Sequence, residues 1–144
     1  MRVLFVTPYV PSRIRIRPFA FLRELSRRHE VAVLTLWSGE REREDLTELR
    51  RLYPTVGVQL TRARALANCV RALPSATPLQ GAYARAPEMT RLLRAALAET
   101  QGDAAMAPAE LRGPYDIVHV EHLRAAHLGA AIPAATPAVV DAVD

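Results

Sequence analysis

This sequence has one cysteine and no long apolar run. The single cysteine, Cys69, excludes an intrachain disulfide and a cysteine-rich metal site. No stretch approaches the roughly 18 apolar residues that a transmembrane helix needs, and the short apolar start lacks the cleavage region of a secretory signal. We therefore predict a cytoplasmic protein that at most rests peripherally on the inner face of the cell membrane.

Glycine is missing from the first 38 residues. Glycines let the backbone approach a phosphate closely, as in the GxGxxG and GxxxxGK[ST] loops of nucleotide-binding folds. Their absence disfavours a dinucleotide-binding domain and a P-loop. An anion that binds near the first strand must therefore be held by side chains.

Lysine is absent and aromatic residues are few. All 19 basic residues are arginine, which we attribute to a GC-rich coding bias rather than to recognition. A formal charge of +4 and a pI near 10.0 permit contact with phosphates, anionic lipids or nucleic acid. The arginines are dispersed among glutamates, and only 6% of residues are aromatic, which leaves few platforms for base stacking. We predict no nucleic-acid partner.

Short apolar runs alternate with amphipathic segments along the chain of 144 residues. Strands are expected at 3–6, 31–37, 56–60, 115–120 and 138–143. Helices are expected at 18–29, 40–52, 62–73, 88–99 and 121–131, with 74–87 and 100–114 as loops. This alternation predicts an α/β fold, a Rossmann-like doubly wound parallel sheet of order 3-2-1-4-5. We expect 1–144 to be a single domain, incomplete because the chain stops inside its last strand.

Two of the expected helices carry a regular apolar ridge. In 40–52 the leucines at 46, 49 and 52 form that ridge, and we expect them to be buried. In 62–73 the ridge consists of Leu66, Val70 and Leu73, surrounded by arginines. Such a basic amphipathic helix can lie on an anionic membrane, although a solvated helix packed on the core explains the same pattern and is favoured.

Three arginines alternate with two isoleucines in the loop after the first strand. In an extended segment Arg13, Arg15 and Arg17 share one face at a spacing of about 6 to 7 Å, and Ile14 and Ile16 share the other. We expect the isoleucines to anchor the loop and the helix to begin after the last arginine, at position 18. Ligands bind at this edge of a parallel sheet, so the three arginines are predicted to bind an anionic substrate. A solvated loop explains the same pattern.

A second polar cluster, HVEHLR, ends the expected fourth strand. In a 3-2-1-4-5 sheet this strand lies beside the first, so Glu121, His122 and Arg124 face the arginine loop. We predict that Glu121 and His122 are catalytic, as a general base or hydroxyl ligand and as a hydrogen-bond donor, and that Arg124 binds substrate. We expect His119 to be buried in the strand. A metal site from His119, Glu121 and His122 is disfavoured because neighbouring side chains alternate faces.

A family resemblance is carried by three segments, MRVLFVTPYVPSRIRIRPFAFLRELSRRHEVAVLTLW, ALPSATPLQGAYARAPEM, and YDIVHVEHLRAA followed by PAVVDAVD. Together they resemble the N-terminal, acceptor-side domain of GT-B fold glycosyltransferases of family 4 (group 1), particularly bacterial sugar transferases of polysaccharide gene clusters. The resemblance implies transfer with retention from a nucleotide-sugar to a glycan or lipid-linked acceptor, without a metal or other cofactor. It also implies that the donor is bound by a C-terminal domain absent from this chain, so the fragment alone is expected to be inactive.

The chain departs from that family in two places. Many members have a glycine pair where this chain has residues 12–17, and the histidine that many carry after the fourth strand falls at Glu121, with His122 one residue later. The alternative is a non-catalytic α/β domain that binds an anion or regulates another protein. The donor sugar, the acceptor, the linkage and the oligomeric state stay open.

Overall fold

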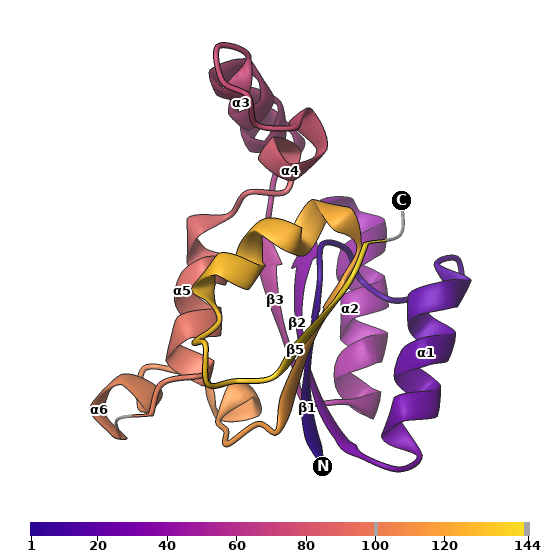
Figure 1. Cartoon of the computed structure of the whole chain (residues 1–144). Coiled ribbons are helices and arrows are strands. Elements are labelled where there is room, and N and C mark those ends of the chain that lie inside the picture. The colour runs from indigo at the N-terminus through magenta and orange to yellow at the C-terminus, as the bar shows by residue number, and fades with distance from the viewer. Residues whose placement is uncertain (100, 143–144) are drawn as a thin grey trace.

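Five parallel strands form the centre of the computed structural model, which describes residues 1–99 and 101–142 (Figure 1). The strands are β1 (Arg2–Thr7), β2 (Glu30–Trp37), β3 (Thr55–Gln59), β4 (Ile117–Glu121) and β5 (Ala138–Asp141). Their order is β3-β2-β1-β4-β5, so the predicted α/β sheet is confirmed. The part of the last predicted strand at Val143 lies outside the described residues.

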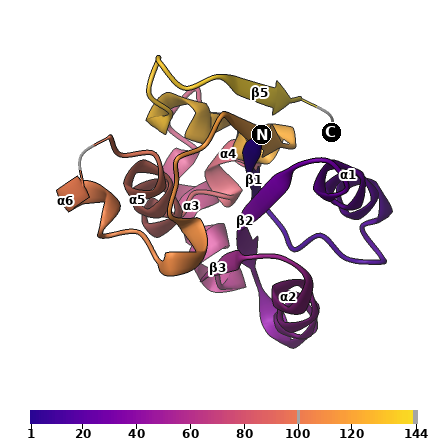
Figure 2. The same ribbon diagram turned by 90° about the horizontal axis from the view of Figure 1, so that it is seen from below.

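Helices cover both faces of this sheet (Figure 2). They are α1 (Ile16–Ser26), α2 (Gly39–Leu52), α3 (Arg62–Ala72), α4 (Leu79–Tyr83), α5 (Pro87–Ala96) and α6 (Gln101–Ala104), with 3₁₀ helices η1 (Ala109–Leu111) and η2 (Leu123–Ala131). Figure 2 shows α1 and α2 on one face and α5 and η2 on the other, as alternate crossover directions require. None of the helices described is long and apolar enough to cross a membrane.

The core has two layers because alternate strand residues point to opposite faces. One layer, under α1 and α2, contains Val3, Phe5, Val31, Val33, Leu22, Leu46 and Leu49. The other, under α5 and η2, contains Leu4, Val6, Ala32, Leu34, Val118, Val120, Met89, Leu93 and Leu128. Burial on both faces explains why β1, β2 and β4 read as continuous apolar runs, whereas the edge strand β5 is mostly exposed.

The start of α1 differs from the prediction. The helix begins at Ile16, and its first hydrogen bond runs from the N–H of Phe19 to the carbonyl of Arg15 at 3.3 Å. Pro18 is therefore the third helical residue, a position where its missing N–H removes no hydrogen bond because first-turn N–H groups have no partner within the helix. The prediction of an extended row of three arginines, ending at Arg17, is wrong.

The predicted anchors of this loop are also wrong. Ile14 and Ile16 are 61% and 71% exposed, whereas Val10 and Pro18 are buried. Since Ile16 already belongs to the helix, period-2 alternation does not apply to it. The apolar residues that hold the loop therefore lie on either side of the arginine segment.

Other segments also differ from the sequence predictions in burial or in the bounds of their helices. In α2, Leu46 and Leu49 are buried as predicted, but Leu52 is exposed. Segment 100–114, expected as a loop, contains α6 and η1 in its described part and buries Leu111. The expected helices end early or start late: α1 ends at Ser26, α5 ends at Ala96, and the helix after β4 is of the 3₁₀ type and begins at Leu123.

The apolar ridge of α3 faces away from the core. Leu66, Val70 and Leu73 are exposed, while Ala65 and Ala72 are the buried residues of this segment. Figure 1 shows α3 and α4 standing apart from the sheet, beyond the carboxyl ends of the strands. The favoured interpretation of this helix as one packed on the core through its apolar ridge is wrong.

Candidate functional site

Side chains from three elements meet at the carboxyl edge of the sheet. Arg17, near the start of α1, points its guanidinium at the ends of β4 and β5. Its Nη1 lies 3.5 Å from Oε1 of Glu121, and its Nη2 donates to Asp141. Because β1 and β4 are neighbours in the sheet, the predicted meeting of the arginine segment with the end of β4 is found. We call this place, the switch point of the sheet between β1 and β4, the carboxyl-edge crevice.

Glu121 lies beneath the crevice rather than in it. Only 2% of its side chain is exposed, and its Oε2 lies 3.1 Å from Nε2 of His119. His119 is itself buried and stacks on Phe5 with ring centroids 5.0 Å apart, so its predicted place inside the strand is confirmed. A carboxylate held between an arginine and a histidine has little surface for a substrate. This burial favours a role for Glu121 in positioning Arg17 over the predicted general base.

Tyr9 forms the centre of the crevice, and the sequence analysis missed it. The guanidinium carbon of Arg15 lies 4.1 Å from the centroid of its ring, and the ring of His122 meets it edge-on at 5.4 Å. Arg15 also donates to Oε1 of Glu42, in α2, at 2.6 Å. The position of Tyr9 just after β1, in the sequence TPYVP, was the available signal.

Charged groups of the crevice also affect the pKa of the Tyr9 hydroxyl. Burial and then the charge of Glu121 raise the pKa of Tyr9, while three arginines act in the opposite direction. Those arginines are Arg15, Arg17 and Arg124. With a raised pKa, the hydroxyl stays protonated at neutral pH and is available as a hydrogen-bond donor.

His122 has an unusual backbone conformation. Its φ is 75° and its ψ 142°, a region that is nearly restricted to glycine and costs about 1–3 kcal/mol. Its Nδ1 accepts the N–H of Arg124 at 3.1 Å and so caps η2. In the neutral ring the proton is then on Nε2, and donation from His122 to a substrate stays a prediction.

Arg124 differs from the other two arginines of the crevice. Its Nε is buried and has no hydrogen-bond acceptor within 1–99 and 101–142. Arg15 and Arg17 already bind carboxylates, at Glu42 and at Glu121 and Asp141. An unpaired buried donor on a cationic side chain is the strongest local reason to expect an anionic ligand here.

Arg13 is not part of the crevice. It lies in the bend before α1 and lines a cavity of about 170 Å³ together with Asp45 and Glu48 of α2. The bend separates it from Arg15 and Arg17, with which it was predicted to share a face. Its predicted role in substrate binding gains no support from this position.

One group of residues has the chemistry to hold a metal ion. His119, Glu121 and Asp141 offer ligand atoms that all lie within 4.8 Å of one another. The sequence analysis missed Asp141, which β5 brings beside β4. The guanidinium of Arg17 already contacts both carboxylates and supplies the compensating positive charge. The ion pair accounts for the cluster without a metal.

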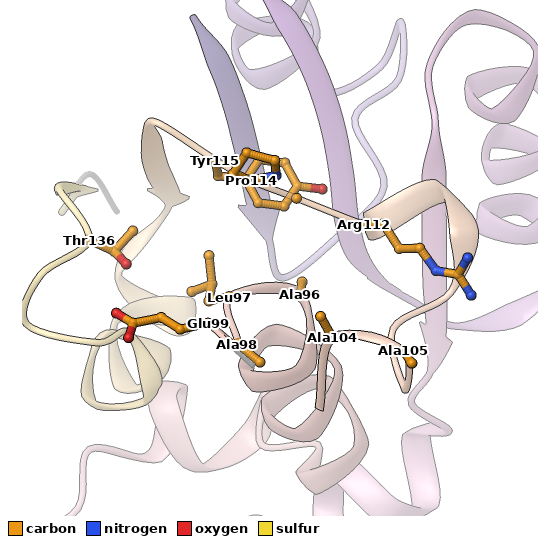
Figure 3. Close-up of a pocket in the computed structure, with 11 residues that line it drawn as sticks. Ala96, Leu97, Ala98, Glu99, Ala104, Ala105, Arg112, Pro114, Tyr115 and Thr136 are labelled. Carbon is orange, nitrogen blue, oxygen red and sulfur yellow. The ribbon is translucent and has the colours of Figure 1, made fainter. Parts of the chain in front are cut away.

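A cavity of about 750 Å³ lies elsewhere, beside the segment that leads into the amino end of β4 (Figure 3). It is lined mainly by small and apolar residues, with Glu99, Arg112, Tyr115 and Thr136 among them. Burial raises the pKa of Tyr115 to about 12, against the opposing effect of Arg2. Ligands of parallel α/β sheets bind at the carboxyl ends of the strands, so this cavity is the less suitable site.

Comparisons with protein-family models, with curated proteins and with solved structures found no match. The function is therefore argued from the site and from the residues that carry the resemblance.

Proposed function

We propose that this chain is the acceptor-side part of a retaining glycosyltransferase of the GT-B type, family 4 (group 1). The whole transferase would move a sugar from a nucleotide-sugar to a glycan or lipid-linked acceptor, at the inner face of the cell membrane. The observation that carries the proposal is the convergence of Tyr9, Arg15, His122 and Arg124 at the carboxyl edge, between β1 and β4. The resemblance of these two segments to that family supports it.

The crevice is chemically suited to an oxygen-rich acceptor. Tyr9 offers a neutral hydroxyl donor, His122 lies beside it, and Arg124 carries a positive charge. The negative charge of Glu121 is compensated by Arg17, 3.5 Å away, which reduces its repulsion of a phosphate. Donors of this kind bind the hydroxyl groups of a sugar and the oxygens of a phosphate. The nucleotide-sugar is bound by a second domain, and no metal takes part.

The test separates donor binding from acceptor binding. Calorimetry on residues 1–144 with UDP-glucose and GDP-mannose should show no micromolar binding, because the donor pocket belongs to the second domain. A two-domain protein, in which the donor-binding domain follows residues 1–144, should move radiolabelled sugar from a nucleotide-sugar into a membrane extract, with the anomeric configuration retained. Micromolar binding of either donor by residues 1–144, or no consumption of any donor by the two-domain protein, contradicts the proposal.

The second candidate is a non-catalytic α/β domain that binds an anion. One observation favours it: Arg15 and Arg17 are paired with carboxylates, whereas the Nε of Arg124 has no acceptor among the described residues. Such a domain binds a phosphate without turning over a sugar donor. The transfer assay with the two-domain protein distinguishes the two.

A further inference from the structure

The α3–α4 lobe, residues 62–83, exposes more apolar surface than a solvated helix pair needs. Its exposed apolar side chains are Leu66, Val70, Leu73, Leu79 and Tyr83, each between 40% and 68% accessible. The lobe is joined to the body where α4 packs on η2. Figure 1 shows the lobe projecting beyond the carboxyl ends of the strands. Contiguous exposed apolar residues mark an interaction surface.

Helical spacing puts these residues on regular ridges. Leu66, Val70 and Leu73 follow each other at intervals of four and three residues and so share one face of α3. The side of α3 that packs inward carries Ala65 and Ala72 instead. On α4, Leu79 and Tyr83 are also four residues apart. Because the small alanines face inward, the large apolar side chains point outward.

The charge of the lobe has a single sign. Residues 62–83 contain three arginines, at positions 62, 64 and 71, and no aspartate or glutamate. All three are exposed, and none forms an ion pair within the described part of the chain. By contrast, α2 carries both signs interspersed. An apolar face surrounded by unpaired arginines is complementary to a surface that is apolar and anionic at once.

We infer that the α3–α4 lobe docks on an anionic lipid bilayer. Leu66, Val70 and Leu73 enter the boundary between headgroups and acyl chains, and the arginines contact acidic headgroups. Tyr83 suits the same boundary because its ring is apolar and its hydroxyl polar. A second copy of the chain is the less suitable occupant, since a two-fold interface would bring these arginines against themselves.

The inference that the lobe binds lipid depends only on the surface of the lobe. Its link to sugar transfer rests on the proposed function, because the carboxyl-edge crevice lies at the same end of the sheet as the lobe. A docked lobe would therefore bring the crevice close to the bilayer that carries a lipid-linked acceptor.

Co-sedimentation of residues 1–144 with vesicles tests the docking. Binding to phosphatidylcholine vesicles containing 30% phosphatidylglycerol should exceed binding to pure phosphatidylcholine at least tenfold, and it should fall as salt is raised. The double substitution Leu66→Gln with Val70→Gln should weaken binding at least tenfold. Leu52→Gln, at an exposed leucine of α2, is the matched control and should leave binding unchanged. Arg64→Gln with Arg71→Gln should remove most of the preference for the anionic lipid.

Thermal melts and sedimentation equilibrium complete the experiment. Because all the substituted side chains are exposed, the melting temperatures should stay within a few degrees of that of the parent. Equal binding to both vesicle types, or unchanged binding of the Leu66→Gln/Val70→Gln variant, overturns the inference. A dimer of the parent that this variant abolishes assigns the surface to a second copy instead. Failure of vesicle binding would leave the donor calorimetry and the transfer assay unaffected, so the two proposals fail separately.

Discussion

At the scale of single residues, the side chains of the crevice differ in their contacts and in their backbone conformation. Tyr9 is fixed from two sides by Arg15 and His122, and Arg124 carries a buried donor without an acceptor. His122 adopts a backbone conformation that few residues other than glycine tolerate. Strain of this kind persists only where the surroundings enforce it, and it is concentrated at functional sites.

The strain at His122 can be measured by comparing two substitutions. His122→Gly and His122→Ala both remove the imidazole and its cap on η2, but only glycine relieves the positive φ. The glycine variant should therefore be more stable than the alanine variant by about 1–3 kcal/mol in urea denaturation. Equal stabilities would show that the positive φ carries no cost. In the transfer assay both variants should lose at least tenfold activity.

Tyr115 gives a prediction about pH and stability. Its hydroxyl is buried without a hydrogen-bond partner in the described structure, so Tyr115→Phe should raise the free energy of unfolding by about 1–3 kcal/mol at pH 7. The pKa of Tyr115 is raised from 10.0 to about 12 in the folded protein, so above pH 10 the unfolded chain loses this proton first. Stability should therefore fall between pH 10 and 12.

Urea denaturation of the parent and of Tyr115→Phe across this range is the measurement. The alkaline loss of stability should be smaller in the phenylalanine variant. If the two curves run parallel from pH 8 to 12, the Tyr115 hydroxyl does not ionise differently in the folded and unfolded states.

At the scale of elements, Arg17 joins α1 to the carboxyl ends of β4 and β5. Its partners are Glu121, which is almost fully buried, and Asp141. His119 supports Glu121 from within β4, stacks on Phe5 of β1 and meets the ring of Phe21 of α1 at a tilt of 42°. The Arg17 ion pair and the contact of Phe21 with His119 therefore both hold the first helix beside the fourth strand.

A double-mutant cycle tests this connection. Arg17→Ala leaves a buried carboxylate with one partner fewer and should lower the free energy of unfolding by about 1–3 kcal/mol. This is less than for a fully buried pair because half of the Arg17 side chain is exposed. Glu121→Gln in the same chain should recover part of the loss, with a coupling of at least about 0.5 kcal/mol.

Arg27→Ala is the control for this cycle. It removes a pair with Glu24 in which both side chains are mostly exposed, and should change stability by no more than about 0.5 kcal/mol. If Arg17→Ala is as mild as Arg27→Ala, or if its effect simply adds to that of Glu121→Gln, Arg17 does not hold α1 to β4.

The elements also show how far the sequence could predict this structure. Apolar runs identified all five strands, and the alternation of strands and helices identified their order. Burial on two faces explains these runs in β1, β2 and β4, but not in β5, which is mostly exposed. The start of α1 was missed because Pro18 is tolerated within a first turn as well as at its first position. Helical spacing shows which residues share a face, as Leu66 and Val70 do, but not whether another element covers that face.

Strand order was the only feature of the site that the sequence could predict. Adjacent strands brought Arg17 beside Glu121, as predicted, because topology alone decides that meeting. Tyr9 and Asp141 were missed, and Arg13 was misplaced, because the path of a loop and the direction of a side chain depend on local packing. The glycosyltransferase activity stays a prediction from the resemblance.

At the scale of the whole molecule, two surfaces lie at the carboxyl end of the sheet. One is the crevice between β1 and β4, and the other is the apolar, arginine-rich α3–α4 lobe (Figure 1). A protein that takes a phosphate-bearing acceptor from a bilayer needs both on one side. We propose that the crevice is a specific binding site for such an anion.

The most direct measurement is an NMR titration of residues 1–144 with inorganic pyrophosphate at constant ionic strength. The amide signals of Tyr9, His122 and Arg124 should shift together and saturate. Arg124→Ala should weaken this binding at least tenfold, about 1.4 kcal/mol, whereas Arg43→Ala, at an exposed arginine of α2 paired with Glu40, should leave it unchanged. Shifts that spread over all arginines without saturating, or equal binding by the parent and Arg124→Ala, would contradict the account.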